Sequence, residues 1–228
     1  MKYDIILLDA DETILDFKQS ENYSLKRVLN HHGFDSESTI LKSSYQKINE
    51  ELWKNHALGF LSKDLLKTER FRLFLKENNL AGDALLMGED YLRALSEKVF
   101  LIEGAYDFLA KLHRKIPLVI VTNGIGHVQN IRLEKSGLKH FIDLMVISEE
   151  CGFSKPDKRI FEHTFKLIGK PISQTRALMI GDRIETDILG AINAGFDSCW
   201  FNPNGDKNQT PHSPTYEVIT LDQIHGLL

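Results

Sequence analysis

Side chains capable of acid–base and metal chemistry follow four short apolar runs in this sequence. Asp9-Ala10-Asp11-Glu12-Thr13 follows the first run, and Thr122-Asn123-Gly124 follows the second. Ser154-Lys155-Pro156-Asp157 comes soon after the third, and Gly181-Asp182 with Asp187 follows the fourth. These segments supply carboxylates, a hydroxyl and one lysine, which are groups that can bind a metal ion, hold a phosphate and assist a leaving group.

Asp9 and Asp11 are predicted to share nucleophilic and acid–base work. Residues two apart, just past the end of a strand, can both turn toward the same ligand. We predict that Asp9 is an in-line nucleophile and that Asp11 donates a proton to the leaving oxygen. This division of labour requires different environments, because one carboxyl group must stay ionised while the other carries a proton.

The acidic residues of these segments also predict a bound cation. Carboxylates crowded at one place repel one another, and a divalent cation removes that repulsion. Asp9 and Asp182, with waters and a phosphate oxygen, suit Mg²⁺, which keeps part of its water shell and takes few carboxylates. Thr122 and the backbone amide of Asn123 are predicted to bind phosphoryl oxygens, and Lys155 to supply positive charge in the transition state.

The apolar runs before these segments are predicted to be strands of a parallel sheet. Apolar runs without alternation are typical of strands buried on both faces, and helical patterns lie between the later runs, which indicates an α/β fold. The predicted strands cover residues 3–8, 118–121, 144–147, 177–180 and 199–201. Because ligands bind at the carboxyl ends of such strands, we expect the four segments to meet at one edge of the sheet.

One long stretch of the chain interrupts this alternation. No buried strand is predicted between about residues 17 and 98, whereas helical faces recur there. These faces are formed by Leu25, Val28 and Leu29, by Phe71, Phe74 and Leu75, and by Leu92 and Leu95. We therefore predict an all-helical domain at residues 17–98, inserted into an α/β core made of residues 1–16 and 99–228.

Composition and termini favour a globular cytoplasmic protein. Residues 5–8 form an apolar stretch too short for a signal peptide or a membrane span. The net charge of -4 favours neither a nucleic acid polymer nor a membrane surface as a partner. Cys151 and Cys199 are isolated in sequence and are expected to be free, buried thiols in a reducing cytoplasm.

Each of the four segments alone has an ordinary structural explanation. Asp and Thr are common at strand exits and helix caps, Thr122-Asn123-Gly124 fits a turn, and Lys155 fits a solvated side chain before a helix. Gly181-Asp182 with Asp187 fits a turn followed by an acid at a helix N-terminus, which the helix dipole stabilises. Coincidence is nevertheless a poor explanation for all four segments, in this order and each beyond a predicted strand.

Taken together, the segments resemble the four motifs of the haloacid dehalogenase superfamily of phosphotransferases. The matching residues are Asp9-Ala10-Asp11-Glu12-Thr13, Val121-Thr122-Asn123, Lys155-Pro156, and Gly181-Asp182 through Asp187. The resemblance covers the whole chain and implies a Rossmann-like core with a helical cap of the C1 type inserted after the first motif.

The resemblance also implies a reaction and a set of metal ligands. It implies a Mg²⁺-dependent phosphatase that works through a phospho-aspartate at Asp9. Asp9, Asp182 and the backbone carbonyl of Asp11 would hold the metal, with Asp187 binding it directly or lying beside its ligands. An acid at position 11 speaks against the dehalogenating members of the superfamily, which protonate no leaving alkoxide.

The first motif further resembles that of bacterial pyrimidine nucleotide 5′-nucleotidases. Glu12 stands where glycine is commoner in the superfamily, and the stretch 56–75, with Gly59 and Glu69-Arg70-Phe71, is also similar. The resemblance therefore implies a (deoxy)pyrimidine nucleoside monophosphate as the substrate. We expect a monomer or weak homodimer with a small phosphate ester as its partner.

Two alternative functions use similar residues. A sugar-phosphate phosphatase or a phosphomutase of the same superfamily would differ mainly in the inserted helical domain. A phospho-aspartate receiver module also uses acidic residues, a threonine and a lysine on an α/β sheet. In receivers, however, the acidic pair and the phosphoacceptor usually lie on different strands, and no long helical insertion follows the first strand.

The helical insertion contains few residues that can be assigned to a site. Phe17, Trp53, Phe60 and Phe71 are able to stack on a nucleobase, but core packing is the expected role of each. Arg70 is expected to form a salt bridge on the surface of a helix rather than to contact a phosphate or sugar.

Overall fold

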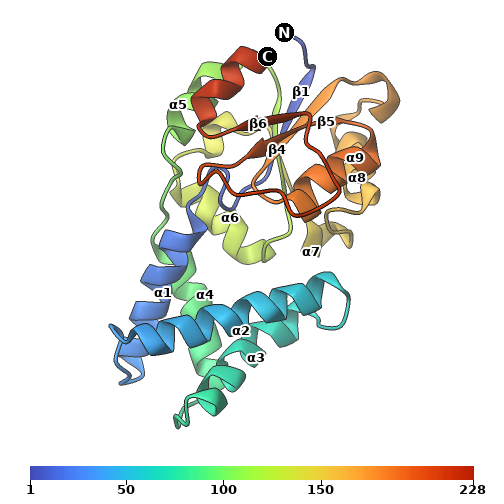
Figure 1. Ribbon diagram of the computed structural model, residues 1–228. Helices are drawn as coiled ribbons and strands as arrows, with labels where there is room; N and C mark the ends of the chain where they lie inside the picture. The colour runs from blue at the N-terminus through green and yellow to red at the C-terminus, as the bar shows by residue number, and fades with distance from the viewer. The chain divides into compact units, whose positions relative to one another are not determined.

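The computed structural model describes residues 1–228, which divide into two compact units. The α/β unit contains residues 1–17 and 100–228, and the helical unit contains residues 18–99. The chain thus leaves the α/β unit after its first strand and returns to it after the helical unit (Figure 1). Every helix of the chain is too short or too polar to cross a lipid bilayer.

The α/β unit is built on a six-stranded sheet in the order β3-β2-β1-β4-β5-β6, and every neighbouring pair is parallel. The strands are β1 Ile5–Leu8, β2 Leu118–Thr122, β3 Leu144–Ile147, β4 Ala177–Gly181, β5 Asp197–Phe201 and β6 Tyr216–Val218. The first five coincide with the predicted apolar runs. The sixth was not predicted, because it has only three residues and its central Glu217 is exposed.

Both faces of the sheet are buried, which explains why the strands are apolar without alternation. On one face, Ile5 and Leu7 pack in a cluster with Met179 and with Phe161. On the other face, Ile6 and Leu8 are also 0% exposed. Figure 1 shows α5 and α6 on one side of the strands and α8 and α9 on the other. This arrangement confirms the predicted α/β class.

Short helices connect the strands of this unit. The α-helices are α5 Ala105–Leu112, α6 Gly126–Lys135, α7 Ser148–Cys151, α8 Lys158–Ile168 and α9 Leu189–Ala194. The 3₁₀ turns are η1 Lys139–Phe141, η2 Ile172–Gln174 and η4 Leu221–Leu227, and η3 Ile184–Ile188 is a π-helical turn. Both cysteines are free; Cys199 is buried, as expected, but Cys151 is only half-buried. Burial raises the pKa of the Cys199 thiol to about 12.

The helical unit consists of most of α1 Phe17–His31, followed by α2 Thr39–Ala57, α3 Lys63–Glu77 and α4 Ala84–Glu97. Three of the four helices begin at a side chain that accepts a hydrogen bond from a backbone amide of the first turn. These residues are Ser38, Ser62 and Asp83. Such caps satisfy amides that have no partner within the helix, so the sequence itself sets these starting points.

A buried arginine lies in the core of the helical unit. Arg70 is 1% exposed, and its guanidinium lies 5.2 Å from the ring centre of Tyr91. It donates hydrogen bonds to the Leu66 carbonyl at 3.2 Å and to the Tyr45 hydroxyl at 3.3 Å. The expectation of a surface salt bridge at Arg70 is therefore wrong. Aromatic faces and oxygen acceptors stabilise the buried guanidinium instead.

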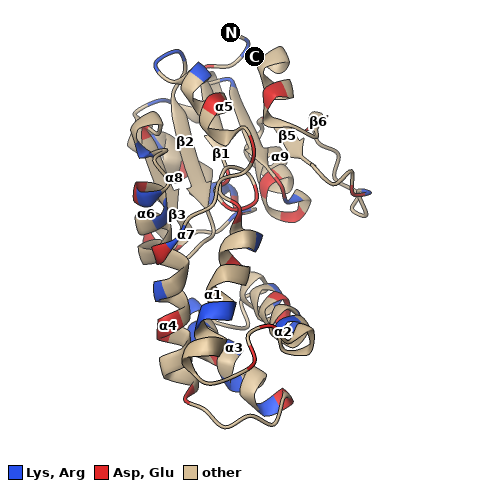
Figure 2. Cartoon of the chain, turned by 90° about the vertical axis from the view of Figure 1, so that its left-hand side faces the viewer, with Lys and Arg blue, Asp and Glu red and all other residues tan.

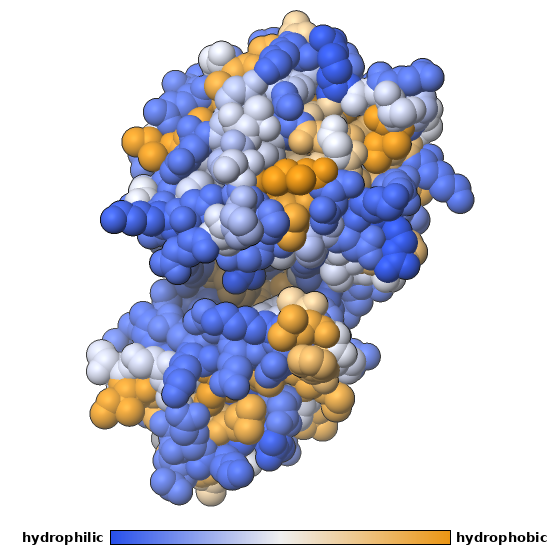
Figure 3. Space-filling view, turned by 45° about the vertical axis from the view of Figure 1, so that its right-hand side comes forward, coloured by the Kyte–Doolittle hydropathy of each residue, from blue (hydrophilic) through white to orange (hydrophobic).

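The aromatic residues considered for base stacking differ in exposure. Phe71 is 0% exposed and packs against Tyr45, which confirms its expected core role. Phe60 is 78% exposed, so the expectation of core packing is wrong for this residue. Trp53 is half-buried and lies near the ring of His56. In Figure 3 most of the visible surface is hydrophilic, with apolar side chains scattered over both units.

Candidate active site

Adjacent strands bring Asp9 and Asp182 to the same edge of the sheet. Asp9 follows β1 and Asp182 follows β4, and the backbone amide of Asp9 donates to the carbonyl of Ile180 at 2.9 Å. In the strand order, β2 lies on the far side of β1 and β5 lies on the far side of β4, so the order of the strands reverses between β1 and β4. Open α/β sheets bind ligands at the carboxyl ends of the strands at such a reversal. Figure 2 shows acidic and basic segments close together near the end of β1.

A third carboxylate joins this pair from the π-helical turn η3. Carboxylate oxygens of Asp9, Asp182 and Asp187 all lie within 4.8 Å of one another. Asp187 is oriented by the backbone amide of Arg183, which donates to its Oδ2 at 3.0 Å. A methyl group at Gly181 would overlap the carboxyl group of Asp187, so this close approach requires glycine at the end of β4.

Lys155 places one positive charge among these carboxylates. Its Nζ lies 2.5 Å from Oδ1 of Asp9 and 2.7 Å from Oδ1 of Asp187, and its side chain is 1% exposed. The side chain of Asn123 holds the backbone of Lys155 at both polar atoms. Its Nδ2 donates to the Lys155 carbonyl at 2.9 Å, and its Oδ1 accepts from the Lys155 amide at 2.9 Å. Sequence reasoning missed this link, because it considered only the backbone amide of Asn123.

Burial, together with the neighbouring charges, shifts the pKa values of these groups. Burial raises the pKa of Asp9 to about 7, and the charges of Asp187 and Asp11 add to the rise while Lys155 opposes it. Burial, together with Asp187 and Asp9, also raises the pKa of Asp182 well above its usual range. Burial lowers the pKa of Lys155, but Asp187 and Asp9 outweigh it and raise that pKa above its ordinary value. The single positive charge of Lys155 thus does not balance the negative charges of the three carboxylates.

Asp11 lies apart from this cluster and is held by helix α6. Gln129 Nε2 donates to Oδ2 of Asp11 at 2.6 Å, and Arg132 Nη1 donates to Oδ1. Gln129 also donates to the hydroxyl of Thr122 at 3.2 Å. The guanidinium of Arg132 lies 5.5 Å from the ring centre of Phe17, and its side chain is 0% exposed. Both oxygens of the predicted acid are therefore occupied by donors from one helix.

Sequence reasoning missed Gln129 and Arg132. The two residues are three positions apart on the helix that follows Thr122-Asn123-Gly124, so they share a face. The three-residue spacing indicates that the two side chains point the same way, but it does not identify Asp11 as the residue that they contact. Gly124 belongs to the same arrangement, because a methyl group there would collide with the side chain of Gln129, which is 2% exposed.

The remaining predicted residue, Thr122, is at the end of β2. Its side chain is buried, and its Oγ1 also accepts a hydrogen bond from the amide of Gly124 at 3.1 Å. The structure thus brings Lys155 into contact with Asp9 and Asp187, and it places a carboxylate oxygen of Asp182 within 4.8 Å of both of these carboxylates. Asn123 is joined to this group by its hydrogen bonds to the Lys155 backbone, whereas Thr122 is joined to Asp11 through Gln129.

A sequence model of a hydrolase family, described as haloacid dehalogenase-like hydrolase, matches residues 3–195, which is most of the chain. The chain belongs to the haloacid dehalogenase-like hydrolase family. It is therefore an enzyme, and the family resemblance inferred from the four motifs is confirmed.

Two relatives within this family carry the name of one activity. The chain is 34% identical over 228 residues to the pyrimidine 5′-nucleotidase YjjG of Escherichia coli (strain K12), covering 100% of this chain and 99% of that protein. It is also 34% identical over 228 residues to the pyrimidine 5′-nucleotidase PynA of Streptococcus pneumoniae (strain ATCC BAA-255 / R6), covering 98% of this chain and 94% of that protein.

A solved structure of another haloacid dehalogenase-like hydrolase has the same fold. The crystal structure of YfnB from Bacillus subtilis, bound to magnesium, superimposes with a TM-score of 0.91. The two sequences are 35% identical, and the match covers 100% of this chain and 99% of that chain. The predicted combination of a parallel sheet with inserted helices is thereby confirmed for the whole chain.

Proposed function

We propose that this hydrolase is a Mg²⁺-dependent phosphatase that acts on (deoxy)pyrimidine nucleoside monophosphates through a phospho-aspartate at Asp9. The observation that carries the reaction is the cluster of Asp9, Asp182 and Asp187 around the buried Lys155, with Asp11 two residues beyond Asp9. The two relatives named pyrimidine 5′-nucleotidases support the substrate class.

The carboxylate cluster fits a magnesium ion. Its three carboxylates lie within 4.8 Å of one another, and Oδ1 of Asp182 is buried without a hydrogen-bond partner. An unpartnered buried oxygen beside two other carboxylates is a suitable environment for a hard divalent cation. Asp9, Asp182 and Asp187, with the backbone carbonyl of Asp11, would hold it. When bound, Mg²⁺ neutralises charge between the carboxylates and the phosphate of the substrate.

Asp9 performs the covalent chemistry in this proposal. One of its carboxylate oxygens forms a bond to phosphorus while the bond between phosphorus and the ester oxygen breaks, and Asp11 gives its proton to that leaving oxygen. A water molecule then forms a bond to phosphorus as the bond between phosphorus and the Asp9 oxygen breaks, and this water transfers a proton to Asp11. Inorganic phosphate leaves, and the carboxylate of Asp9 is restored.

The contacts of Asp11 correspond to one stage of this cycle. Both of its oxygens accept hydrogen bonds, from Gln129 and Arg132, and a carboxylate that only accepts is ready to take a proton from water. For the first step, Asp11 must carry a proton at a position on its oxygens that these two hydrogen bonds leave open. Gln129 and Arg132 are therefore positioning residues for Asp11.

The phosphate group is held by residues of the second and third motifs. The hydroxyl of Thr122 and the backbone amide of Asn123 bind phosphoryl oxygens in this proposal, and Lys155 stabilises the charge that gathers there in the transition state. Lys155 is fixed for this purpose by the side chain of Asn123, which bonds both polar atoms of its backbone.

The substrate class is tested by measuring phosphate release from a panel of esters in the presence of Mg²⁺. The panel contains the monophosphates of uridine, deoxyuridine, thymidine, adenosine and guanosine, together with ribose 5-phosphate and glucose 6-phosphate. We expect kcat/KM for the pyrimidine nucleotides to exceed that for the others by roughly tenfold or more. A preference for a sugar phosphate would overturn the nucleotidase assignment, and hydrolysis of none of these esters would overturn the phosphatase assignment.

A further inference from the structure

A second cluster of metal-binding side chains lies within the helical unit. One ligand atom from each of His31, His32 and Asp90 can be chosen so that all three lie within 4.8 Å of one another. His31 is the last residue of α1, His32 follows it, and Asp90 is on α4. Two of the three donors are imidazoles, so this cluster differs in chemistry from the all-carboxylate cluster of the candidate active site.

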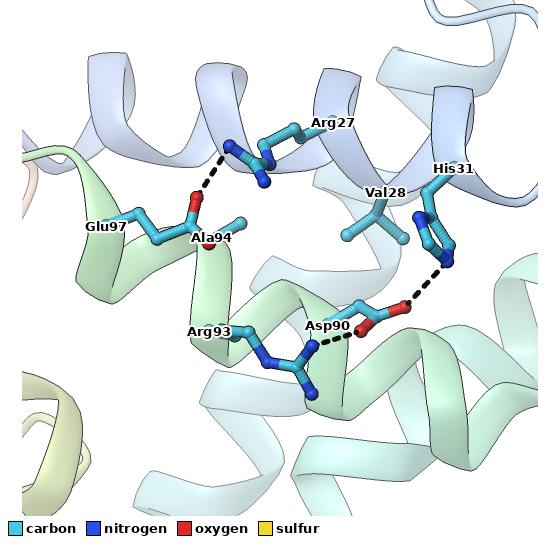
Figure 4. Close-up of a pocket in the computed structure, with 7 residues that line it drawn as sticks. All are labelled: Arg27, Val28, His31, Asp90, Arg93, Ala94 and Glu97. Atoms are coloured by element: carbon cyan, nitrogen blue, oxygen red, sulfur yellow. Dashed lines mark ion pairs between the residues drawn. The ribbon is translucent and has the colours of Figure 1, made fainter.

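The three side chains converge on one oxygen atom. Oδ2 of Asp90 lies 3.0 Å from Nε2 of His32 and 3.8 Å from Nε2 of His31. Consecutive residues of a helix point about 100° apart, and at the end of α1 the side chains of His31 and His32 both turn toward the same carboxylate. The other oxygen of Asp90, Oδ1, is 3.4 Å from Nη1 of Arg93. Figure 4 shows His31 and Arg93 each directed at Asp90.

The cluster combines two partly buried ligands with one exposed ligand. The side chains of His32 and Asp90 are 11% and 14% exposed, whereas that of His31 is 71% exposed. His31, Asp90 and Arg93 line a cavity of about 140 Å³ between α1 and α4 (Figure 4). His32 does not line this cavity, but the Asp90 carboxylate borders it, so the cavity has room for the water ligands of an ion held beside Asp90. An ion can therefore enter from solvent on the side of His31.

The surrounding charges permit a cation at this position. Arg27, which also lines the cavity, is paired with Glu97 at 2.6 Å. Arg93 contacts Oδ1 of Asp90, whereas the two imidazoles approach Oδ2. The side chain of Arg93 is 67% exposed. The guanidinium of Arg93 can therefore turn into solvent without breaking another contact among the cavity residues.

We propose that His31 Nε2, His32 Nε2 and Asp90 Oδ2 form a site for a divalent transition metal ion such as Zn²⁺. Ligands at bonds of about 2.0–2.1 Å in a tetrahedron lie about 3.3 Å apart, close to the separations found around Asp90. Imidazole nitrogen favours zinc, nickel, cobalt or copper over Mg²⁺, which prefers oxygen. Water completes the coordination shell on the cavity side.

The position of this site in the chain predicts its effect on the protein. Helix α1 leads the chain into the helical unit, and α4 leads it out. An ion bound by His31, His32 and Asp90 links the end of α1 to α4. Because such an ion binds the folded unit and not the unfolded chain, it stabilises the fold by mass action.

The test is a calorimetric titration of the full chain with Zn²⁺, in excess Mg²⁺ so that oxygen-ligand sites are already filled. His31→Ala removes an exposed ligand, Asp90→Asn keeps the shape of the carboxylate, and His127→Ala removes an exposed histidine of α6 as a matched control. We expect the wild type and His127→Ala to bind one Zn²⁺ per chain with equal affinity. Each of the other two variants should bind that ion roughly tenfold more weakly or worse.

Thermal unfolding with and without Zn²⁺ gives a second measurement. The wild type should melt at a higher temperature with Zn²⁺, and His31→Ala should lose most of that increase. Absence of Zn²⁺ binding by the wild type, or equal binding by the wild type, His31→Ala and Asp90→Asn, would overturn the proposal. Neither measurement uses phosphatase activity, so its outcome is independent of the function proposed above.

Discussion

The ammonium group of Lys155 lies 2.7 Å from Oδ1 of Asp187, and both side chains are 1% exposed. The same ammonium group contacts Asp9 at 2.5 Å. One buried positive charge therefore lies between two buried carboxylates, beside the third carboxylate of Asp182. This arrangement makes the stability of the metal-free enzyme depend on Lys155 and on pH.

Replacing Lys155 with methionine should destabilise the metal-free enzyme. The substitution leaves Asp9 and Asp187 buried without their cation, and breaking a buried ion pair in this way costs about 3–5 kcal/mol. Urea denaturation in EDTA measures the effect. Lys158→Met is the matched control, because Lys158 is 62% exposed on α8 and should change stability by less than about 0.5 kcal/mol. Equal stabilities of the two variants would contradict this prediction.

The stability gained from Mg²⁺ should increase with pH. Burial raises the pKa of Asp9 from 3.8 to about 7, so the folded metal-free protein holds this proton more tightly than the unfolded chain does. Its stability should therefore fall as the pH rises from about 4 to about 7. Mg²⁺ binds the ionised carboxylates, so the melting temperature should rise by several degrees more with Mg²⁺ at about pH 8 than at about pH 5. A pH-independent effect of Mg²⁺ would count against the proposed metal ligands.

Replacing Arg132 with methionine should reduce turnover more than substrate binding. Asp11 loses the donor to its Oδ1, while the methionine fills most of the buried volume. We expect kcat to fall on the order of 10-fold to 100-fold with a smaller change in KM, and the pH dependence of kcat to shift. Arg176→Met is the control, because Arg176 pairs with Asp4 beyond the amino ends of β1 and β4. An unchanged kcat for Arg132→Met would show that Asp11 needs no positioning by Arg132.

Replacing Glu12 with glycine should preserve both fold and activity. Glu12 has a φ of 59°, a left-handed conformation that costs residues other than glycine about 1–2 kcal/mol. Glycine removes this strain but loses more entropy on folding, so stability should stay equal or rise by up to about 1 kcal/mol. Glu12→Val should lower stability by about 1–2 kcal/mol. Thermal unfolding of the wild type and both variants checks this order of stabilities. A Glu12→Gly variant that is less stable than the wild type would contradict the prediction.

The strands and the shared edge could be predicted because burial on both faces determines which residue types a strand contains. A strand covered on both faces must be apolar throughout, and parallel strands must end at the same edge. Asp9, Asp182 and Asp187 are therefore found together. β6 has only three residues and an exposed Glu217, so its pattern is too weak to detect.

Contacts made by helix faces were harder to predict from sequence. Gln129 and Arg132 share a face of α6, but helical spacing does not tell which residue they face across space. Arg70 was misplaced on the surface because charged residues are rarely buried. Its burial depends on the ring of Tyr91 and the hydroxyl of Tyr45, which come from two other helices.

The most direct test of the proposed reaction is phosphate release from deoxyuridine monophosphate in Mg²⁺ by the wild type, Asp9→Asn and Asp206→Asn. Asp206 is an exposed aspartate of the same unit, so its variant controls for the loss of a carboxylate. Circular dichroism of each variant verifies the fold. We predict turnover by the wild type and Asp206→Asn and none by a folded Asp9→Asn. Retained turnover in Asp9→Asn would contradict the assignment of Asp9 as the nucleophile.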